Sequence, residues 1–508
     1  MSASAANVGT SSTATASSSS SRLLLLAGYF QQMREIVGRY GGAVEKFIGD
    51  AVMAVWGAPT AHEDDPERAV RAALEMGEAV RRLGASSGID ELDVRAAVLT
   101  GEAAVTVGAQ GQGMVAGDLV NTASRLQSVA APGTVLVGQE TRDAASQGIT
   151  FEPVGEESLK GKSAPVPAWR AVRVIAGVGG AGRYTGIEPP FEGRDEQLRL
   201  LKDLFHATAR ERRARVVTII GQGGTGKSRL VREFEKYTDG LAETIFWHVG
   251  RSPAYGEEIT FWALGEMVRK RAGLAERDDE PTTRQRIVST LEEFVPDEGD
   301  RRWIEPRLLQ LLGVGEGRSG EREELFAAWR MFFERVADRG PVVMAFEDLE
   351  NADPGLLDFI DYVVEWSRSR PLFILALTRP ELLERRPNWG AGQRAFAAIG
   401  LEALTDEAMR QALAGLVPGL PEPAVQAILS RAEGVPLYAV ETVRMLINDG
   451  RLTERDGIYQ PVGDLTELEI PNTLHALIAA RLDALEPDER AIVQDAAVLG
   501  HSLSLIHI

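Results

Sequence analysis

The sequence Gly221-Gln-Gly-Gly-Thr-Gly-Lys227-Ser228 follows the apolar run Val216-Val-Thr-Ile-Ile220. A β-branched run, a glycine-rich loop and a helical pattern from Arg229 are the parts of a phosphate-binding cradle. Loop N–H groups converge on phosphate oxygens, Lys227 would reach the β- and γ-phosphates, and the Ser228 hydroxyl would hold Mg²⁺. The predicted nucleotide contacts are Gly221, Gly223, Gly224, Thr225, Gly226, Lys227 and Ser228. The alternative, an ordinary glycine-rich turn, is disfavoured once the strand before it and the helix after it are counted.

Composition excludes several classes of protein. The 508 residues suggest about three domains, and 44% hydrophobic with 25% charged residues is typical of a globular chain. A net charge of −19 argues against a nucleic-acid surface over the whole chain. The absence of cysteine excludes disulfides and fits a reducing, cytoplasmic location. No apolar run approaches the ~18 residues that cross a bilayer, so no membrane segment is expected.

The first residues are serine, alanine and threonine with almost no large apolar side chain. Such a segment buries too little surface to offset its ordering entropy, so residues 1–22 are predicted to be disordered. The run Leu23–Leu26 is too short for a signal peptide. The spacing of the apolar residues from Leu23 to Tyr40 predicts a helix that ends at Gly41-Gly42.

Two apolar runs between Ala43 and Pro59 meet at Gly49-Asp50, which predicts a hairpin with Asp50 at its turn.

Strands over 92–99 and 102–108 and a helix over 117–127 follow. Asn121 and Arg125 lie four residues apart on that helix, so they can address one ligand together. Taken alone, Asp50 is also compatible with a simple turn residue, and the pair on the helix with a solvated surface. His62 beside acidic residues is disfavoured as a metal ligand, because acids are expected at a helix start.

Three motifs in this region resemble class III nucleotidyl cyclases: Val44-Glu-Lys-Phe-Ile-Gly-Asp50, the helix Gly117-Asp-Leu-Val-Asn-Thr-Ala-Ser-Arg125, and Leu159-Lys-Gly-Lys-Ser-Ala-Pro-Val-Pro-Ala-Trp169. The resemblance implies a ferredoxin-like α+β domain that converts ATP to cyclic AMP and pyrophosphate at a homodimer interface, with two Mg²⁺ or Mn²⁺ ions. It further implies that Asp50 binds metal and Lys46 reads the base. Asn121 would orient the ribose, and Arg125 would neutralise charge in the transition state.

The chain departs from the family in two places. The family takes its first metal aspartate from an opening strand with a pattern like Phe-Ala-Asp-Ile-x-Gly-Phe, whereas residues 1–49 contain no aspartate. We therefore expect the opening strand to be missing. The position seven residues before Asn121 usually holds Asp or Thr to accept from the adenine amino group, and here it is Met114, a weak acceptor.

Glycines near residue 180 predict a linker, after which Pro189-Pro-Phe-Glu-Gly-Arg194-Asp-Glu-Gln-Leu198 leads into the phosphate-loop strand. This lead-in resembles signal-transduction ATPases of the STAND branch of the AAA-like families, in which it touches the adenine. The resemblance makes Arg194 a nucleotide contact. The alternative is an ordinary turn between domains.

Two later strands are predicted to contribute to the same site. Pro341–Phe346 is a buried-type strand that ends in Glu347-Asp348, and the resemblance assigns Glu347 to the metal and Asp348 to water or metal. Pro371–Leu377 ends in Thr378-Arg379, where Arg379 resembles a sensor of the γ-phosphate, with a plain surface arginine as the alternative. The family continues with Leu-His-Trp-Ala-Asp-Pro, but here the sequence is Leu349-Glu-Asn-Ala-Asp-Pro354.

From Leu401 the pattern is helical, and Gly434-Val-Pro436 resembles the nucleotide-sensing Gly-x-Pro element of that ATPase family. Pro471 to Leu499 resembles the start of a winged helix. The last residues look non-native, and we expect a fragment truncated at both ends. Aromatic residues near Phe326 and Trp329 are interpreted as core, with a base-stacking platform as the sharper alternative.

The sequence thus predicts an α/β multidomain protein with a parallel-sheet P-loop domain and a C-terminal all-α region. The leading hypothesis is a cyclic-AMP-forming enzyme fused to an ATP-dependent switch. The alternatives are a regulatory ATPase with an inactive cyclase-like dimerisation domain, and a transcription regulator, which needs a DNA-binding element that the acidic C-terminal part does not show. ATP is the expected ligand, with no nucleic-acid partner. The predicted segments are 1–22 (disordered), 23–174 (cyclase-like), 175–188 (linker), 189–400 (ATPase), 401–500 (helical) and 501–508 (non-native tail).

Overall fold

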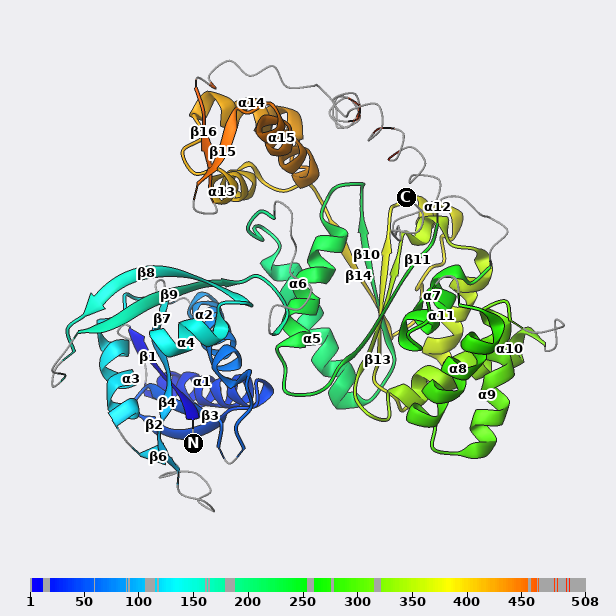
Figure 1. Ribbon diagram of the computed structural model, residues 1–508, viewed down its shortest axis with the longest axis horizontal. Helices are drawn as coiled ribbons and strands as arrows, with labels where there is room; N and C mark the ends of the chain where they lie inside the picture. Colours follow the sequence, from blue (N-terminus) through cyan, green and yellow to red (C-terminus); the bar gives the residue numbers. More distant parts are fainter. Residues whose placement is uncertain are drawn as a thin grey trace. The chain divides into compact units, whose positions relative to one another are not determined.

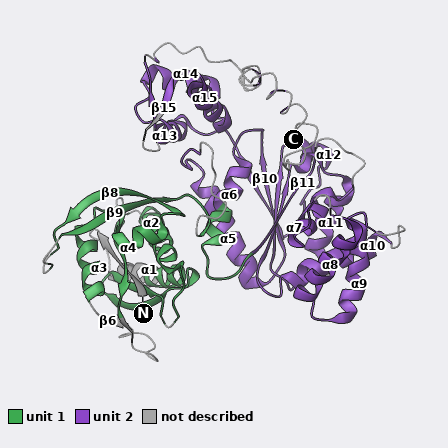
Figure 2. Ribbon diagram, viewed as in Figure 1, with its two compact units in different colours: residues 1–184, 234–245 green, residues 185–233, 246–508 purple. Residues whose placement is uncertain are grey.

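The computed structural model describes most of the chain and divides it into two compact units (Figure 2). Unit 1 comprises residues 1–184 and 234–245, and unit 2 comprises residues 185–233 and 246–508. The described residues are 2–11, 19–105 without 59, 88, 90 and 91, 115–178 without 117, 160, 161, 163 and 164, 188–253, 260–314 without 276 and 277, 321–463 without 456 and 457, 465, and isolated positions beyond it. The predicted linker glycines from 179 onward, the winged-helix start and the C-terminal tail therefore lie almost wholly outside the described residues.

Unit 1 is built on a seven-stranded sheet with the order β2-β3-β1-β4-β7-β9-β8 (Figure 1). Only the β4–β7 pairing in it is parallel among the described strands. The strands of unit 1, including the small pair β5–β6, are β1 (Ser2–Ser11), β2 (Ala43–Ile48), β3 (Ala51–Trp56), β4 (Asp93–Glu102), β5 (Ala104–Val105), β6 (Val115–Ala116), β7 (Thr134–Gly138), β8 (Ile149–Glu157) and β9 (Val166–Val174). The predicted hairpin is confirmed, with Gly49 at φ +64 in its turn.

Helices cover both faces of this sheet. They are α1 (Ser19–Arg39), α2 (Asp65–Ser86), α3 (Asp118–Val129) and α4 (Gln139–Ala145). Trp56 Nε1 donates to the carbonyl of Tyr40 just after α1 at 2.9 Å, whereas the preceding Val55 forms with Met53 a cluster against which Val120 of α3 packs. Because successive strand residues point to opposite faces, α1 and α3 lie on opposite sides of the sheet.

The prediction of disorder was wrong for Ser2–Ser11 and for the residues from Ser19 onward, and the opening strand is not missing; residues 1 and 12–18 lie outside the described residues. The backbone of Ser2–Ser11 forms β1, which pairs antiparallel with β3 on one side and with β4 on the other. The helix that follows begins at Ser19 rather than at Leu23. The prediction considered only how much side-chain surface serine and alanine can bury. It missed the hydrogen-bond ladders that a central strand makes along both of its edges.

Unit 1 also contains Phe234–Ile245, the end of helix α6 (Lys227–Asp239) and the residues after it. Arg71 of α2 is buried and donates to the carbonyls of Lys236 and Ala176, each at 2.8 Å. Its guanidinium also pairs with Glu67 one helical turn earlier, at 2.5 Å. The buried guanidinium thus donates to a carbonyl in the last turn of α6, where a cation also complements the helix dipole.

Unit 2 is built on a five-stranded, wholly parallel sheet with the order β11-β12-β13-β10-β14. Its strands are β10 (Arg215–Gly221), β11 (Phe246–Arg251), β12 (Val342–Glu347), β13 (Leu372–Thr378) and β14 (Phe396–Leu401). The predicted parallel-sheet P-loop domain is confirmed. Because parallel strands share one direction, the residues after β10, β12 and β13 meet at one edge of the sheet.

Helices and an aromatic core surround this sheet. The helices are α5 (Asp195–Glu211), α6, α7 (Trp262–Arg271), α8 (Glu280–Phe294), α9 (Glu298–Leu311), α10 (Arg322–Val336), α11 (Pro354–Trp366) and α12 (Glu381–Arg385), with a 3₁₀ turn η2 (Leu349–Asn351) after β12. Phe326 and Trp329 are buried and pack edge-on against Phe359. The core interpretation of these aromatic residues is therefore confirmed, and the stacking platform is excluded for them.

The C-terminal part of unit 2 begins with helices α13 (Asp406–Leu416), α14 (Glu422–Ala432) and α15 (Pro436–Asn448). The prediction of an all-α region was wrong beyond α15, because strands β15 (Leu452–Arg455) and β16 (Ile458–Pro461) form an antiparallel hairpin. The sequence between them is Asp456-Gly457, a residue pair that favours short hairpin connections. Across the described residues, no helix has the length and apolar character that a membrane span requires.

Candidate nucleotide site

The glycine-rich loop after β10 has the backbone of a tight cradle. Gly224 and Gly226 have φ +83 and +100, which L side chains rarely adopt. Gly221 is constrained by space, since a Cβ there would come within 2.6 Å of Thr225 Oγ1. The Nζ of Lys227 donates to the carbonyls of Gly221 at 2.7 Å and Gln222 at 3.2 Å. The lysine therefore folds back over the loop on which it was predicted to act.

The loop ends where α6 begins at Lys227, so unpaired N–H groups of the helix start lie at the cradle. Ser228 is exposed in the first turn of α6, where its hydroxyl is available to a cation. Burial lowers the pKa of Lys227, while the nearby charge of Glu350 acts in the opposite direction. The site combines hydrogen-bond donors with a cation, as phosphate binding requires.

Glu347 ends β12 and Asp348 follows it at the same edge of the sheet. Asp348 adopts φ +54, a left-handed conformation that aspartate tolerates better than most residues. Both carboxylates contact Arg251 at the end of the neighbouring strand β11. The Nη2 of Arg251 lies 2.6 Å from Glu347 Oε2, and its Nε lies 3.3 Å from Asp348 Oδ2.

Sequence reasoning missed Arg251. The parallel register pairs Arg251 with Glu347, so the contact follows once β11 and β12 are known to be neighbours. The oxygens of Ser228, Glu347 and Asp348 are the donors that Mg²⁺ prefers. Among the described residues, no group of three or more acidic or histidine side chains is arranged to hold a metal ion.

Arg379 follows β13, the strand between β12 and β10, so it emerges beside the loop. A Cβ built on Gly223 would lie 3.8 Å from the guanidinium carbon of Arg379. The Nε of Arg379 is 2.9 Å from Glu350 Oε1, and its backbone N donates to Glu350 Oε2 at 3.1 Å. Glu350 therefore holds Arg379 at the phosphate loop. The sequence had indicated Glu350 only as part of a departure from the family pattern.

The lead-in segment and the C-terminal helices both contact the loop. Arg194 is buried and donates to the carbonyls of Thr225 and Glu402, and burial lowers its pKa. The Gly-x-Pro element, Gly434 to Pro436, also lies against the loop, since a Cβ built on Gly224 of the loop would lie 2.9 Å from Val435 Cγ1. The N–H of Leu437 donates to the Gly224 carbonyl at 3.4 Å. Residues predicted to respond to nucleotide thus lie directly against the loop.

In unit 1, the predicted site residues come from one hairpin and one helix. Asp50 is exposed in the β2–β3 turn, and Lys46 lies opposite Met53 in the pairing of the two strands. Opposite residues of an antiparallel pair point to the same face, and Met53 belongs to the cluster that includes Val120 of α3. Lys46 therefore lies on the face of the sheet that carries α3.

Helix α3 presents Asn121 and Arg125 away from its buried side, which consists of Thr122, Ala123 and Leu126. Asn121 is exposed and Arg125 is half-buried, so both can reach a ligand. Asp118 at the start of α3 pairs with Lys162 of the third family motif. Met114 lies outside the described residues.

Strand β1 and the β2–β3 turn, as far as the structure describes them, supply one carboxylate between them. The last pairing of β1 with β3 joins Val8 to Val52, so Gly9 to Ser11 run beside the start of β3, which follows Asp50. The sequence of β1 is Ser-Ala-Ser-Ala-Ala-Asn-Val-Gly-Thr-Ser, without a carboxylate. At the end of the sheet where β3 begins, Asp50 is thus the single acidic residue that β1 and the β2–β3 turn supply.

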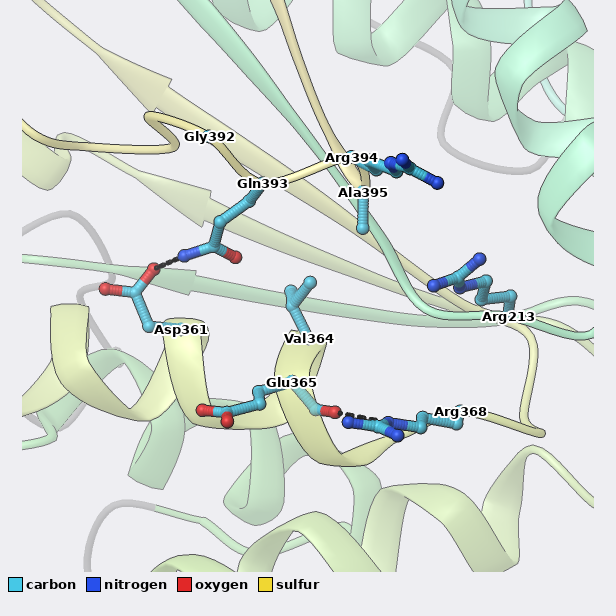
Figure 3. Close-up of a pocket in the computed structure, with 9 residues that line it drawn as sticks. All are labelled: Arg213, Asp361, Val364, Glu365, Arg368, Gly392, Gln393, Arg394 and Ala395. Atoms are coloured by element: carbon cyan, nitrogen blue, oxygen red, sulfur yellow. Dashed lines mark hydrogen bonds between the residues drawn. The ribbon is translucent and has the colours of Figure 1, made fainter.

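A hollow at the other edge of the unit 2 sheet is lined by residues that precede β10, β13 and β14 (Figure 3). Gln393 Nε2 donates to Asp361 Oδ1 at 3.5 Å, and Arg368 Nε donates to the Glu365 carbonyl at 3.2 Å. The hollow lies at the amino ends of the strands, away from the glycine-rich loop, and none of the predicted site residues lines it. We assign it no part in the nucleotide chemistry.

Comparison with protein families gives two matches. Residues 7–169 match the adenylate and guanylate cyclase catalytic domain, and residues 190–375 match the AAA ATPase domain. The first match begins within β1, in agreement with a strand that sequence reasoning had considered absent.

Among curated proteins, an uncharacterised protein of Rhizobium meliloti is 27% identical over 375 residues, covering 70% of this chain and 35% of its own length. This match is longer than either domain, so it includes parts of both. Adenylate cyclase 1 of R. meliloti is 33% identical over 168 residues, covering 30% of this chain and 24% of the relative. The chain thus spans about a third or less of these relatives.

Among solved structures, the adenylyl cyclase CyaB from P. aeruginosa is 26% identical and covers 34% of this chain and 94% of its own, with a TM-score of 0.32. The guanylate cyclase domain of RhGC from Catenaria anguillulae, in complex with GTP, is 22% identical and covers 34% of this chain and 97% of its own, with a TM-score of 0.31. The chain is thus similar to the adenylate and guanylate cyclase family over residues 7–169 and to the AAA ATPase family over residues 190–375.

Proposed function

We propose that this chain is the cyclase and switch portion of a cytoplasmic signalling protein that forms cyclic AMP from ATP, and that ATP bound at the P-loop regulates it. The observation that carries the proposal is the convergence of three strand ends in unit 2. The loop after β10, the carboxylates after β12 and Arg379 after β13 meet at one edge of the parallel sheet. These are the parts that phosphoryl transfer requires.

At this site the chain's residues would bind and hydrolyse ATP. The loop N–H groups and Lys227 hold the phosphates, and Arg379 neutralises charge at the γ-phosphate. Mg²⁺, held through Ser228 and Glu347, would supply charge neutralisation when bound. Asp348 accepts a proton from the attacking water, whose oxygen bonds to the γ-phosphorus as the bond to the β-phosphate oxygen breaks. The products are ADP and inorganic phosphate.

In unit 1 the proposed reaction is attack of the ribose 3′-oxygen on the α-phosphorus of ATP, with pyrophosphate as the leaving group. Lys46 would read the base, Asn121 would orient the ribose and Arg125 would neutralise the transition state. Asp50 would contribute to the metal site. Lys46 and Asp50 serve opposite halves of a dimer interface in the family, so we propose a homodimer.

A second candidate function is favoured by the composition of β1. Strand β1 brings no carboxylate to the end of the sheet where Asp50 lies, so β1 and the β2–β3 turn together offer one acidic donor where a two-metal reaction uses two. In this alternative, unit 1 is an inactive dimerisation module and ATP hydrolysis in unit 2 is the chemistry of the chain.

The proposal is tested by binding and hydrolysis of Mg²⁺-ATP by wild type, Lys227→Ala and Lys270→Ala. Lys270 is exposed on α7, so its variant controls for the loss of one surface cation. We expect both activities to be lost only in Lys227→Ala. Equal activity in Lys227→Ala and wild type would refute a nucleotide site at this loop.

A further inference from the structure

Glu350 is an acidic residue at the nucleotide site that has no role in the proposed hydrolysis of ATP. It lies in the 3₁₀ turn η2 directly after the strand-end carboxylates, and its side chain is only 9% exposed. A carboxylate this buried requires partners that compensate its lost hydration.

Those partners are the residues at the end of β13. Glu350 Oε1 lies 2.9 Å from Arg379 Nε. Glu350 Oε2 accepts from the Arg379 backbone N at 3.1 Å and from Thr378 Oγ1 at 3.4 Å. Glu350 thus contacts both the backbone and the guanidinium of Arg379, which restricts the orientation of an arginine side chain that is itself 49% exposed.

The backbone of Glu350 is fixed from another direction. Arg385 of α12 donates to the Glu350 carbonyl through Nη1 and to the Ala352 carbonyl through Nη2, the latter at 3.1 Å. The turn that carries Glu350 is therefore tied to the helix that follows Arg379. A positioning group needs such support, because a mobile carboxylate would not fix a guanidinium.

The guanidinium is aimed at the phosphate loop. The Nε of Arg379 is paired with Glu350. The Nη2 of Arg379 lies 3.8 Å from the position that a Cβ on Gly223 would take. A guanidinium offers donors on Nε and on both terminal nitrogens in a fixed plane. Holding Nε in place therefore sets the direction in which the terminal nitrogens can reach a ligand.

We propose that Glu350 is a positioning residue that orients Arg379 toward the terminal phosphate of bound ATP, and so gives the site its preference for ATP over ADP. The inference rests on the proposed nucleotide site. It predicts that the two side chains act as a unit, so that removing either one removes the same preference.

The test measures binding of ADP and of the slowly hydrolysed analogue ATPγS, each with Mg²⁺, by competition against a fluorescent nucleotide. Glu350→Gln keeps the shape of the side chain but loses its charge. We expect it to reduce the preference for ATPγS roughly tenfold, the lower end of what a hydrogen bond to a charged group contributes. Arg379→Ala should lose a similar factor, and adding Glu350→Gln to it should cause no further loss.

Glu384→Gln, an exposed carboxylate on α12, is the matched control and should leave the preference unchanged. Arg379→Lys keeps the charge but has no Nε–H for Glu350, so it provides a second test and should also lose the preference. An unchanged preference in Glu350→Gln, or a further loss in the Arg379→Ala background, would overturn the inference alone. A wild-type chain that binds no nucleotide, or one whose binding survives Lys227→Ala, would overturn the proposed site and this inference with it.

Discussion

Replacing Arg71 with methionine tests the packing of unit 1 most sharply. The side chains of Arg71 and Glu67 are 2% and 3% exposed, and the pair is 2.5 Å apart. Methionine fills much of the volume of arginine but removes the guanidinium from the buried Glu67 carboxylate. It also removes the donors to the Lys236 and Ala176 carbonyls.

Breaking a buried ion pair by removing one partner costs about 3–5 kcal/mol. For a unit of about 200 residues, that cost corresponds to a fall of roughly 10 °C in the unfolding temperature. The assay is thermal and urea unfolding of the whole chain, followed by limited proteolysis that reports which unit opens first. We expect unit 1 to become the less stable of the two.

The matched control lies on the same helix. Arg82 and Glu78 have the same i,i+4 spacing in α2, but their side chains are 35% and 49% exposed and 3.9 Å apart. Arg82→Met should therefore change stability by under about 0.5 kcal/mol. If Arg71→Met were no more destabilising than Arg82→Met, the buried pair would not have the structural role given to it here.

Three further predictions concern unit 2, the phosphate loop and β1. Burial lowers the pKa of His248 to about 3, so the unfolded state binds its proton first as the pH falls. Stability should therefore decrease by about 1.4 kcal/mol per pH unit below pH 6.5 toward pH 3, and His248→Gln should remove this slope in acid unfolding curves. Gly224→Ala should abolish nucleotide binding in a fluorescence titration, because alanine is strained at φ +83 and its Cβ would lie 2.9 Å from Val435. Asn7→Asp places a carboxylate on β1 in the sequence Ala-Asp-Val, and we expect it to raise Mn²⁺-supported cyclic AMP formation in a chromatographic assay, whereas Asn7→Ala should not.

The parts of the fold that the sequence predicts are those with strong local signals. The β-branched run before Gly221, the glycines of the loop and the strand that ends in Glu347 define the P-loop unit without any knowledge of its neighbours. The hairpin at Gly49-Asp50 is predicted for the same reason, since a turn pair separates two apolar runs.

The elements that were missed depend on long-range pairing. Nothing local in Ser2–Ser11 indicates a strand, and its stability comes from β3 and β4, which lie 40 or more residues further along the chain. Arg251 and Glu350 likewise acquire their roles only when the order β11-β12-β13-β10 brings their strand ends together. Sequence spacing cannot supply that order, because it is fixed by how the sheet assembles.

Turnover of ATP labelled on its α-phosphate, with Mg²⁺ or Mn²⁺ and with cyclic AMP resolved from ADP, is the most direct test of both proposed sites. We expect ADP formation that is lost in Lys227→Ala and retained in Asp50→Ala, and cyclic AMP formation that depends on Asp50. ADP formation that persists in Lys227→Ala would contradict the assignment of the P-loop as the working ATP site. ADP without cyclic AMP would leave the P-loop assignment intact and identify unit 1 as an inactive cyclase-family module.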